Sequence, residues 1–155
     1  YTVDIYLPEA SQSGISGSVP VVIISHGLGS DRTSFEYLAQ HLASYGFAVL
    51  VPEHPGSNRE QLEALLEGIE SEVAEPTEFA NRPLDISYML DYLERQAANN
   101  PEYQSLNLKN VGVIGQSFGG YTALAIAGAA IDFKSLDQNC QNLENTFNLS
   151  LLLQC

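Results

Sequence analysis

Segments with the pattern of buried strands alternate along this chain with segments that have the spacing of amphipathic helices. Continuous runs rich in β-branched residues occupy positions 19–25 and 47–51, and a shorter run occupies 111–114. Between these runs, apolar residues recur every three or four positions, as they do on one face of a helix. Strands that are buried on both faces and joined through helices form parallel sheets. The sequence therefore predicts an α/β protein with a mostly parallel sheet and helices on both faces.

Two pairs of residues have the spacing of capping boxes and predict where helices begin. Thr33 and Glu36 form one pair, and Ser57 and Glu60 form the other. In such a box the hydroxyl accepts from the backbone N–H of the acidic residue three positions later, and the carboxylate of that residue accepts from the backbone N–H of the capping residue. We expect an amphipathic helix after each pair, the second of them acidic and extending through residues 62–73.

Other element boundaries follow from proline and from periodicity. Residues 1–7 alternate between apolar and polar, which predicts a half-buried strand that ends at Pro8. Pro83 is expected as the first residue of a further helix that ends near residues 99–101, because the ring of proline fits the first turn. Residues 118–131 are almost all small or apolar, so we expect a helix that is buried on all sides.

The charge of the chain excludes one class of partner. The 155 residues include 6 basic and 19 acidic side chains, for a net charge of −13. A surface this acidic repels the phosphate backbone of nucleic acids, which proteins neutralise with Lys and Arg. No run approaches the roughly 20 apolar residues that a membrane-spanning helix needs. We therefore expect no nucleic-acid binding and no transmembrane segment.

The compartment stays open, with a lean toward export. Cys140 and Cys155 are too few for a disulfide framework or a zinc site, but one bridge between them would suit an exported protein. The sequence begins at Tyr1 without a signal peptide, so we expect that any export signal was removed or lies outside it. Asn148 begins a glycosylation sequon, which has meaning only in a eukaryotic secretory protein.

The sequence Gly-Gln-Ser-Phe-Gly-Gly at residues 115–120 contains a G-x-S-x-G pattern. It follows a predicted buried strand directly and opens a predicted helix, which is the context of a nucleophile elbow. A turn this sharp strains the backbone of the serine, and the glycines at 115 and 119 leave room for it. Ser117 is therefore a candidate nucleophile. The alternative is that Gly115, Gly119 and Gly120 only let a helix pack close to a strand.

A second glycine-containing turn follows the strand at residues 19–25. It consists of residues 25–29, Ser-His-Gly-Leu-Gly. Such a turn can direct a backbone N–H toward the position of a tetrahedral oxyanion, with the N–H of Phe118 as the other donor. Neither this turn nor the one at 115–120 has the lysine of a P-loop or the three glycines of a dinucleotide site. Together the two turns favour acyl transfer.

One known superfamily has similar sequences at both turns. The α/β-hydrolase superfamily, and within it the platelet-activating-factor acetylhydrolase and dienelactone-hydrolase-like branches, resembles this chain in SHGLGSDRTSFEYLAQHLASYGFAVLVPEHPGSN at 25–58 and in VGVIGQSFGG at 111–120. The resemblance extends over about residues 1–130. This chain differs from the acetylhydrolases at Gln116, where they have histidine. Dienelactone hydrolases have cysteine as the nucleophile, so Ser117 argues against that activity.

The resemblance implies a role for several residues. It implies Ser117 as the nucleophile and the backbone N–H groups of Leu28 and Phe118 as the oxyanion hole. The implied supporting residues of the two turns are His26, Gly27, Gly115 and Gly119. No metal or organic cofactor is implied.

The general base is missing from its expected place. In this superfamily the order along the chain is serine, then the acid, then histidine. Here His26, His41 and His54 all precede Ser117. We therefore expect the acid and the histidine beyond residue 155, and we expect the 155 residues alone to be inactive. An alternative with His26 as the base stays open, although the resemblance implies that this residue orders its loop.

The end of the chain has a different character. We expect residues 1–134 to form the N-terminal part of an α/β-hydrolase domain and residues 135–155 to begin a helical cap, lid or insertion. Asp132 and Asp137 are the alternatives for a triad acid within the chain. A sheet without further strands has an open apolar edge, so we expect the isolated chain to associate through it.

The resulting functional hypothesis is a serine hydrolase that cleaves carboxylic esters through an acyl-enzyme on Ser117. The resemblance implies a small-molecule or lipid-like ester that is neutral or zwitterionic, with a short or modest acyl chain. Separately, the acidic surface is expected to disfavour strongly anionic substrates. Two alternatives stay open: a non-catalytic binding module on the same fold, and a peptidase, thioesterase or acyltransferase, since one fold supports many reactions.

Overall fold

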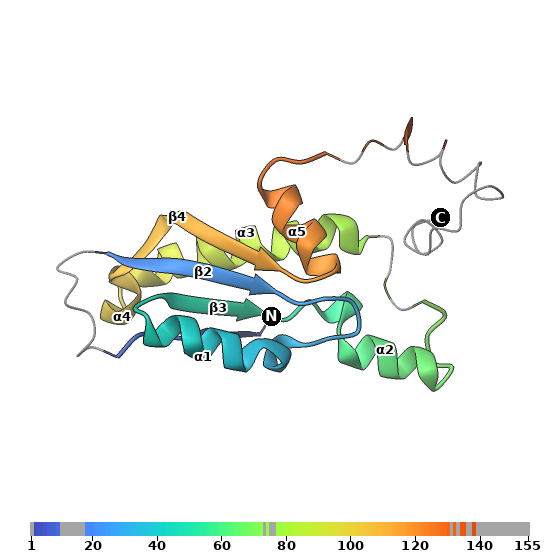
Figure 1. Ribbon diagram of the computed structural model, residues 1–155, viewed down its shortest axis with the longest axis horizontal. Coiled ribbons are helices and arrows are strands. Elements are labelled where there is room, and N and C mark those ends of the chain that lie inside the picture. Colours follow the sequence, from blue (N-terminus) through green and yellow to red (C-terminus); the bar gives the residue numbers. More distant parts are fainter. Residues whose placement is uncertain are drawn as a thin grey trace.

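A four-stranded sheet organises the part of the chain that the computed structural model describes, namely residues 2–9, 18–72, 74, 77–130, 132, 134, 135 and 138. The strands in sheet order are β1 (Val3–Tyr6), β3 (Ala48–Pro52), β2 (Val19–Ser25) and β4 (Leu106–Gly115). The three strands β2, β3 and β4 are parallel, and the edge strand β1 is antiparallel to β3 (Figure 1). The predicted fold class is confirmed.

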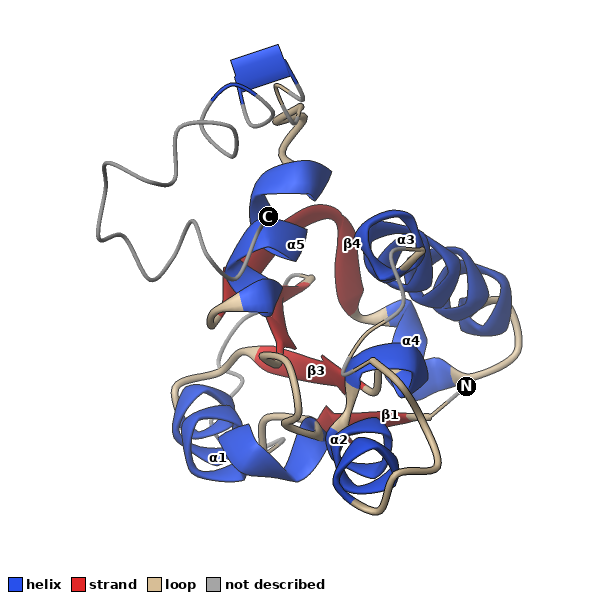
Figure 2. Ribbon diagram, turned by 90° about the vertical axis from the view of Figure 1, so that its right-hand side faces the viewer, coloured by secondary structure: helices blue, strands red, loops and turns tan. Residues whose placement is uncertain are grey.

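The helices cover both faces of this sheet. The helix α1 lies on one side of the sheet and α3 lies on the other (Figure 2). The short 3₁₀ turns η1 and η2 precede α1 and α2, and α5 packs on β4 and β2 and contacts α3. The bounds of these elements are η1 Arg32–Phe35, α1 Glu36–Ser44, η2 Pro55–Ser57, α2 Arg59–Leu66, α3 Glu78–Ala97, α4 Pro101–Gln104 and α5 Phe118–Ile126.

The core consists of two apolar clusters, one on each face of the sheet. On one face, Ile23 and Leu50 pack with Ile86 of α3. On the other face, Ile24 and Val51 pack with α1. Adjacent residues of a strand point to opposite faces, so a strand with helices on both sides must be apolar throughout. This is why β2 and β3 appear in the sequence as unbroken apolar runs.

The register of β2 and β4 brings the two glycine-containing turns together. Ile24 lies beside Ile114, and Ser25 lies beside Gly115. Parallel strands end at the same edge of a sheet, so the turn that follows Ser25 and the turn that follows Gly115 leave the sheet side by side. The backbone N–H of Gln116 also donates to the carbonyl oxygen of Ser25 at 3.3 Å.

The two predicted capping boxes are wrong in detail. Asp31 caps η1 by accepting from the N–H groups of Thr33 and Ser34, so Thr33 does not cap α1. Asn58 caps α2 by accepting from the Gln61 N–H. A short polar residue one or two positions away supplied a better acceptor in each case, because the entry of the chain into the helix is set by the preceding loop.

The acidic helix α2 is shorter than the predicted segment 62–73. It ends at Leu66, and Gly68 then adopts a positive φ of 73°. Glycine readily adopts this conformation and commonly ends helices. Leu66 and Ile69 are consequently exposed. Apolar spacing continued past the glycine, but the local backbone preference ended the helix.

Pro83 is not the first residue of its helix. The helix α3 begins at Glu78, so Pro83 lies inside its second turn. Proline has no N–H, and the carbonyl oxygen four residues earlier therefore receives no helical hydrogen bond. That oxygen belongs to Phe79, and it accepts a hydrogen bond of 2.8 Å from the Tyr121 hydroxyl of α5 instead. The missing donor is replaced by a contact between helices.

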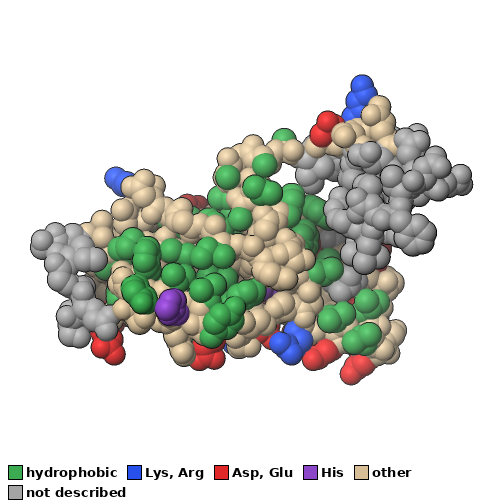
Figure 3. All heavy atoms as spheres, in the orientation of Figure 1, with side chains coloured by type: hydrophobic (Ala, Val, Ile, Leu, Met, Phe, Trp, Pro, Cys, Tyr) green, Lys and Arg blue, Asp and Glu red, His purple; other side chains and the backbone are tan. Residues whose placement is uncertain are grey.

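The helix α5 is not buried on all sides, contrary to the expectation for residues 118–131. Only Gly119 and Thr122 of α5 are buried, and Leu124 is 63% exposed. Apolar composition indicates a surface that requires cover, but it does not reveal how many neighbours supply that cover. Hydrophobic side chains accordingly gather over α5 and over α1 with the neighbouring strands in Figure 3.

Several other expectations concern residues outside the described ranges. These are Asp137, Cys140, Asn148 and Cys155, and with them nearly all of the predicted cap at 135–155. Association through the edge strand β4 stays a prediction. Among the described helices, none combines the length and the apolar character that crossing a bilayer requires.

Candidate active site

Ser117 occupies a strained turn between β4 and α5. The strand β4 ends at Gly115 and α5 begins at Phe118, so two residues reverse the chain (Figure 1). Ser117 has φ 53° and ψ −118°, and no other non-glycine residue of the described ranges has a positive φ. Such backbone strain concentrates at functional sites. Ser117 is also exposed, so its hydroxyl is accessible to a reacting molecule.

The glycines around Ser117 are required by space. A Cβ atom at Gly115 would collide with the carbonyl oxygen of Gly119. A Cβ atom at Gly119 would collide with the carbonyl oxygen of Ser25 at the end of β2. At Gly120 the nearest atom to such a Cβ is 3.6 Å away, which is ordinary contact. Gly115 therefore lets the turn fold back on the start of α5, Gly119 lets α5 close against β2, and Gly120 is required for neither contact.

The turn after β2 lies directly against this serine. A Cβ atom at Gly27 would lie 3.3 Å from Cβ of Ser117 and 3.2 Å from the carbonyl oxygen of Gln116. Leu28, the next residue, is 42% exposed. Within the described ranges, neither the Leu28 N–H nor the Phe118 N–H donates a hydrogen bond. No described acceptor therefore occupies either of the two amides predicted for the oxyanion hole.

His26 holds the peptide that carries the Leu28 N–H. Its Nε2 accepts from the His54 backbone N–H at 3.1 Å, so in the neutral ring Nδ1 carries the proton and donates to the Gly27 carbonyl oxygen at 2.8 Å. In a trans peptide the C=O and the N–H point in opposite directions. The buried imidazole therefore directs the Leu28 N–H away from itself. Burial, with the nearby His54 and Arg82, lowers the pKa of His26 to about 4.

A serine, a histidine and an aspartate also form a chain beneath the loop. Ser25 Oγ lies 3.0 Å from His54 Nε2, and His54 Nδ1 lies 2.7 Å from Asp85 Oδ2. This is the order of groups in a catalytic triad. Ser25 and His54 are fully buried, however, so no substrate reaches the hydroxyl. These hydrogen bonds instead tie the end of β2 and the segment after β3 to the second turn of α3.

Sequence reasoning missed Arg82, a fully buried cation of α3. Its Nη1 donates to the His26 carbonyl oxygen at 2.6 Å, and its Nε donates to Ser57 Oγ at 2.8 Å. Its guanidinium carbon lies 4.3 Å from the centroid of the Phe118 ring. Burial lowers the pKa of Arg82 to about 10, so the side chain remains protonated at neutral pH. Ser57 Oγ also donates to Glu78 Oε2 at 2.7 Å.

A signal for Arg82 is present in the sequence. The buried residues of α3 are Glu78, Arg82, Ile86, Met89 and Leu93. They recur every three or four positions, so the two charged residues extend the apolar stripe of the helix. A charge in line with an apolar stripe indicates a buried and paired group.

Among the described residues, none of the predicted bases or acids forms a hydrogen bond with Ser117. His26 and His54 are buried and use both ring nitrogens elsewhere. His41 is on α1, where its ring packs on Tyr45. Asp132 is exposed and accepts from the backbone N–H of Ser135 at 3.0 Å.

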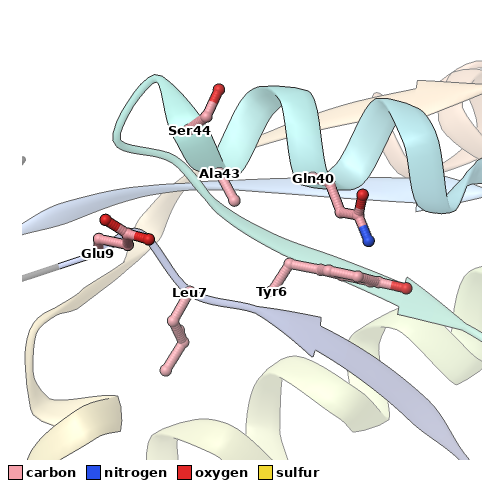
Figure 4. Close-up of a pocket in the computed structure, with 6 residues that line it drawn as sticks. All are labelled: Tyr6, Leu7, Glu9, Gln40, Ala43 and Ser44. Carbon is pink, nitrogen blue, oxygen red and sulfur yellow. The ribbon is translucent and has the colours of Figure 1, made fainter.

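A hollow of about 360 Å³ lies away from these turns, between the end of β1 and α1. Its lining includes Tyr6 and Leu7 from β1 and the loop after it, and Ala43 and Ser44 from α1 (Figure 4). Tyr6 pairs with Val49 near the beginning of β3. The hollow is therefore at the opposite end of the parallel strands from Ser117.

Gly27 offers a test of how closely the two turns must approach. Its φ is not positive, so alanine is allowed by the backbone, but the new Cβ would press on Gln116 and Ser117. We expect Gly27→Ala to lower kcat/KM for any reaction at Ser117 by about tenfold or more, since one oxyanion-hole donor is worth about 2.7–4 kcal/mol. Steady-state kinetics beside thermal unfolding would check this result.

The control for this variant is Gly68→Ala. Nothing lies within 4 Å of a Cβ at Gly68, although its positive φ makes alanine there mildly destabilising. We expect Gly68→Ala to lower the melting temperature and to leave kcat/KM unchanged. The opposite pattern, with Gly27→Ala fully active, would contradict a functional approach of the two turns.

Comparison with known proteins places these two turns in a wider context. A family model described as "alpha/beta hydrolase fold" matches residues 20–143, which include both turns and the strands before them. Two solved structures are similar to the chain. One is a ferulic acid esterase from Streptomyces cinnamoneus, with 23% identity and a TM-score of 0.52, over 73% of this chain and 34% of that one.

The other solved structure is a dienelactone hydrolase from Anabaena variabilis. It is 26% identical, with a TM-score of 0.49, over 81% of this chain and 50% of that one. The chain thus matches about a third of the first structure and half of the second.

Proposed function

The chain belongs to the α/β hydrolase fold family, and on that premise we propose that the protein is a serine hydrolase that cleaves carboxylic esters through Ser117. One observation carries the proposal. Ser117 is exposed in a turn with positive φ that contacts the turn after β2 at Gly27, and no described acceptor takes a hydrogen bond from the Leu28 or the Phe118 N–H. An exposed nucleophile with unoccupied backbone donors on its own turn and on the adjacent one supports acyl transfer.

The proposed reaction begins with attack of Ser117 Oγ on the carbonyl carbon of the ester. The π electrons of the carbonyl move to its oxygen, and the resulting oxyanion accepts hydrogen bonds from the Leu28 and Phe118 N–H groups. The tetrahedral intermediate collapses, the alcohol leaves with the proton taken from the serine, and an acyl-enzyme remains. Water then attacks this ester, which releases the carboxylic acid and restores Ser117.

The base that takes the serine proton is proposed to lie outside these 155 residues. His26 and His54 have both ring nitrogens engaged with other groups, and His41 is on α1. A serine hydroxyl is a weak nucleophile without an adjacent base. We propose that a histidine and an acid from elsewhere in the protein complete the triad.

The proposed substrate is a neutral or zwitterionic ester, either a small molecule or lipid-like. The net charge of −13 creates a negative field that repels anions at low ionic strength. Arg82, the arginine that contacts both turns, is buried and therefore is not available to pair with an anionic group of a substrate.

A fluorophosphonate probe on the complete protein tests the proposal. The probe phosphonylates an activated serine, and its phosphonyl oxygen occupies the oxyanion hole. We expect stoichiometric labelling of Ser117, located by peptide mass spectrometry, and no labelling of Ser117→Ala. The exposed Ser44 provides the matched control, because Ser44→Ala should be labelled like the wild type.

Absence of labelling, beside a control serine hydrolase that is labelled, would refute the proposal and favour a binding module. A panel of ester, thioester and amide substrates of equal acyl group then identifies the leaving group. We expect the largest kcat/KM for the ester. A larger value for the thioester or the amide would replace the esterase with that activity.

A further inference from the structure

Arg82 contacts both of the segments that carry the proposed oxyanion-hole amides. From α3 its Nη1 donates to the His26 carbonyl oxygen at 2.6 Å, and its guanidinium carbon lies 4.3 Å from the centroid of the Phe118 ring. His26 begins the loop that carries the Leu28 N–H, and Phe118 supplies the second N–H itself. One planar, fully buried cation therefore connects the two donors.

The part of α3 that carries Arg82 is attached to α5 by separate contacts. The ring of Phe79, three residues before Arg82 on α3, packs against the rings of Phe118 and Tyr121. Its centroid lies 5.0 Å from the centroid of each of them. The Tyr121 hydroxyl donates to the Phe79 carbonyl oxygen that Pro83 leaves without a helical donor. The first two turns of α3 are thus attached to the helix that follows the elbow, and Arg82 reaches from there to the other segment.

The charge of Arg82 is only partly compensated. Among the described residues, the carboxylate that pairs with it is that of Glu78, whose Oε2 lies 4.0 Å from Nε of Arg82. Ser57 Oγ hydrogen-bonds to both the guanidinium and this carboxylate. Among the described residues, no group accepts from Nη2, although this nitrogen is buried. A buried charge with an unused donor destabilises a fold relative to an apolar residue of similar size. Such a cost is expected where function requires the group.

We propose that Arg82 is a positioning residue for the reaction at Ser117, because its guanidinium holds the loop of the Leu28 N–H in register with the Phe118 N–H. The proposal rests on the proposed serine hydrolase function. Two donors stabilise an oxyanion only when both lie about 2.7–3.1 Å from the position that the oxygen occupies in the transition state. Loosening their register therefore affects the transition state more than the bound substrate, and lowers kcat rather than raising KM.

The test uses the complete protein, with rates expressed per serine that the fluorophosphonate probe titrates. Arg82→Met removes the guanidinium group and keeps an unbranched apolar side chain in the space that it filled. We expect its kcat to fall by about ten- to a hundredfold, below the effect of deleting a donor outright, with KM within about twofold of the wild type. The matched control is Arg95→Met, an exposed arginine on the same helix, which should retain wild-type values.

Two further variants distinguish the hydrogen-bonding geometry of the Arg82 guanidinium from its charge and from its contact with the Phe118 ring. Arg82→Lys keeps a positive charge but cannot both reach the His26 carbonyl and stack on Phe118, so its kcat should remain well below the wild-type value. Phe118→Leu keeps the backbone N–H and removes the ring, and should lower kcat in the same direction. If Arg82→Met does not fold, these two variants decide the question.

A trifluoromethyl ketone analogue of the ester supplies a readout that a purely structural role would not change. It forms a tetrahedral oxyanion on the serine. Its affinity should fall in the Arg82 variants by the same factor as kcat/KM. A structural role alone would lower the titratable fraction and the melting temperature and leave the per-site kcat and the affinity for the ketone intact.

The possible failures are distinguishable. If wild-type protein is labelled at Ser117 while the Arg82 variants keep their per-site kcat or their affinity for the ketone, the positioning role is refuted and the proposed function stands. If wild-type protein is neither labelled nor active on esters, the proposed function is refuted and this inference falls with it.

Discussion

Gly119→Ala is expected to destabilise the protein by about 3 kcal/mol and to remove nearly all activity at Ser117. The added Cβ would collide with the carbonyl oxygen of Ser25. Both atoms belong to regular structure, since Gly119 is in the first turn of α5 and Ser25 ends β2. No side-chain rotation relieves the collision, so α5 must move away from the strand and carry the Phe118 N–H with it.

Gly120→Ala is the matched control for this experiment. The residue is adjacent, in the same helix, and a Cβ there has its nearest neighbour at 3.6 Å. Alanine favours a helix over glycine by about 1 kcal/mol, so this variant should be as stable as the wild type or more stable. Urea unfolding and fluorophosphonate labelling of both variants would measure the difference. Equal stability and equal labelling of the two would contradict the close approach of α5 to β2.

Acid is expected to destabilise the protein through His26. Burial lowers the pKa of this residue from 6.5 to about 4 in the folded protein. Between these two values the unfolded chain binds a proton that the folded chain does not, so the free energy of unfolding rises with pH across this window. Above the window the contribution of His26 is complete, and it is lost as the pH falls through it. The loss amounts to about 3 kcal/mol when the window has been crossed.

The physical reason lies in the hydrogen bonds of the imidazole. Nε2 accepts from the His54 N–H, so a proton on Nε2 would remove that bond and place a charge next to the buried Arg82. Urea unfolding at several pH values from about 4.5 to 7.5 measures the slope of the free energy of unfolding against pH. His26→Asn should be less stable at neutral pH and should lose most of the slope that His26 causes.

The control is His41→Asn at an exposed position of α1, whose slope should equal that of the wild type. An unchanged slope in His26→Asn would contradict the assignment to this ring. If His26→Asn does not fold, titration of the histidine ring resonances by NMR in the wild type reports the same pKa directly. A value above 6 for His26 would contradict the expectation.

The strands and the two turns of the candidate site were predictable from the sequence because they depend on short-range patterns. A strand buried on both faces must be an unbroken apolar run, and 19–25 and 47–51 have this form. A sharp turn from strand to helix requires glycine two residues on either side of the strained residue, which indicated Ser117. The two turns meet because they follow neighbouring parallel strands, which end at one edge of the sheet.

Helix boundaries were predicted less well. The spacing of Thr33 and Glu36 fits a capping box, but the path of the preceding loop places Asp31 where its carboxylate accepts from the N–H groups of Thr33 and Ser34. Pro83 fits a first turn by its own conformational preference, yet it lies in a second turn because Tyr121 of another helix satisfies the carbonyl that it leaves free. The first of these outcomes depends on loop geometry and the second on a contact between residues far apart in the chain.

The sequence by itself determined where the strands lie to within a few residues, where the glycine turns occur and which serine lies in the strained one, because those properties are set by neighbours within a few positions. The exception is β4, which begins at Leu106 rather than at 111 and alternates between partly buried and exposed residues over 111–115, so the prediction of a buried strand at 111–114 was wrong in length and burial. Only the tertiary structure decided that Arg82 connects His26 with Phe118 and that the hydroxyl of Ser25 is buried against His54. Those contacts join α3, α5 and β2 with the segments that follow β2 and β3. Their existence depends on how helices pack on a twisted sheet, and periodicity along the chain contains no measure of that.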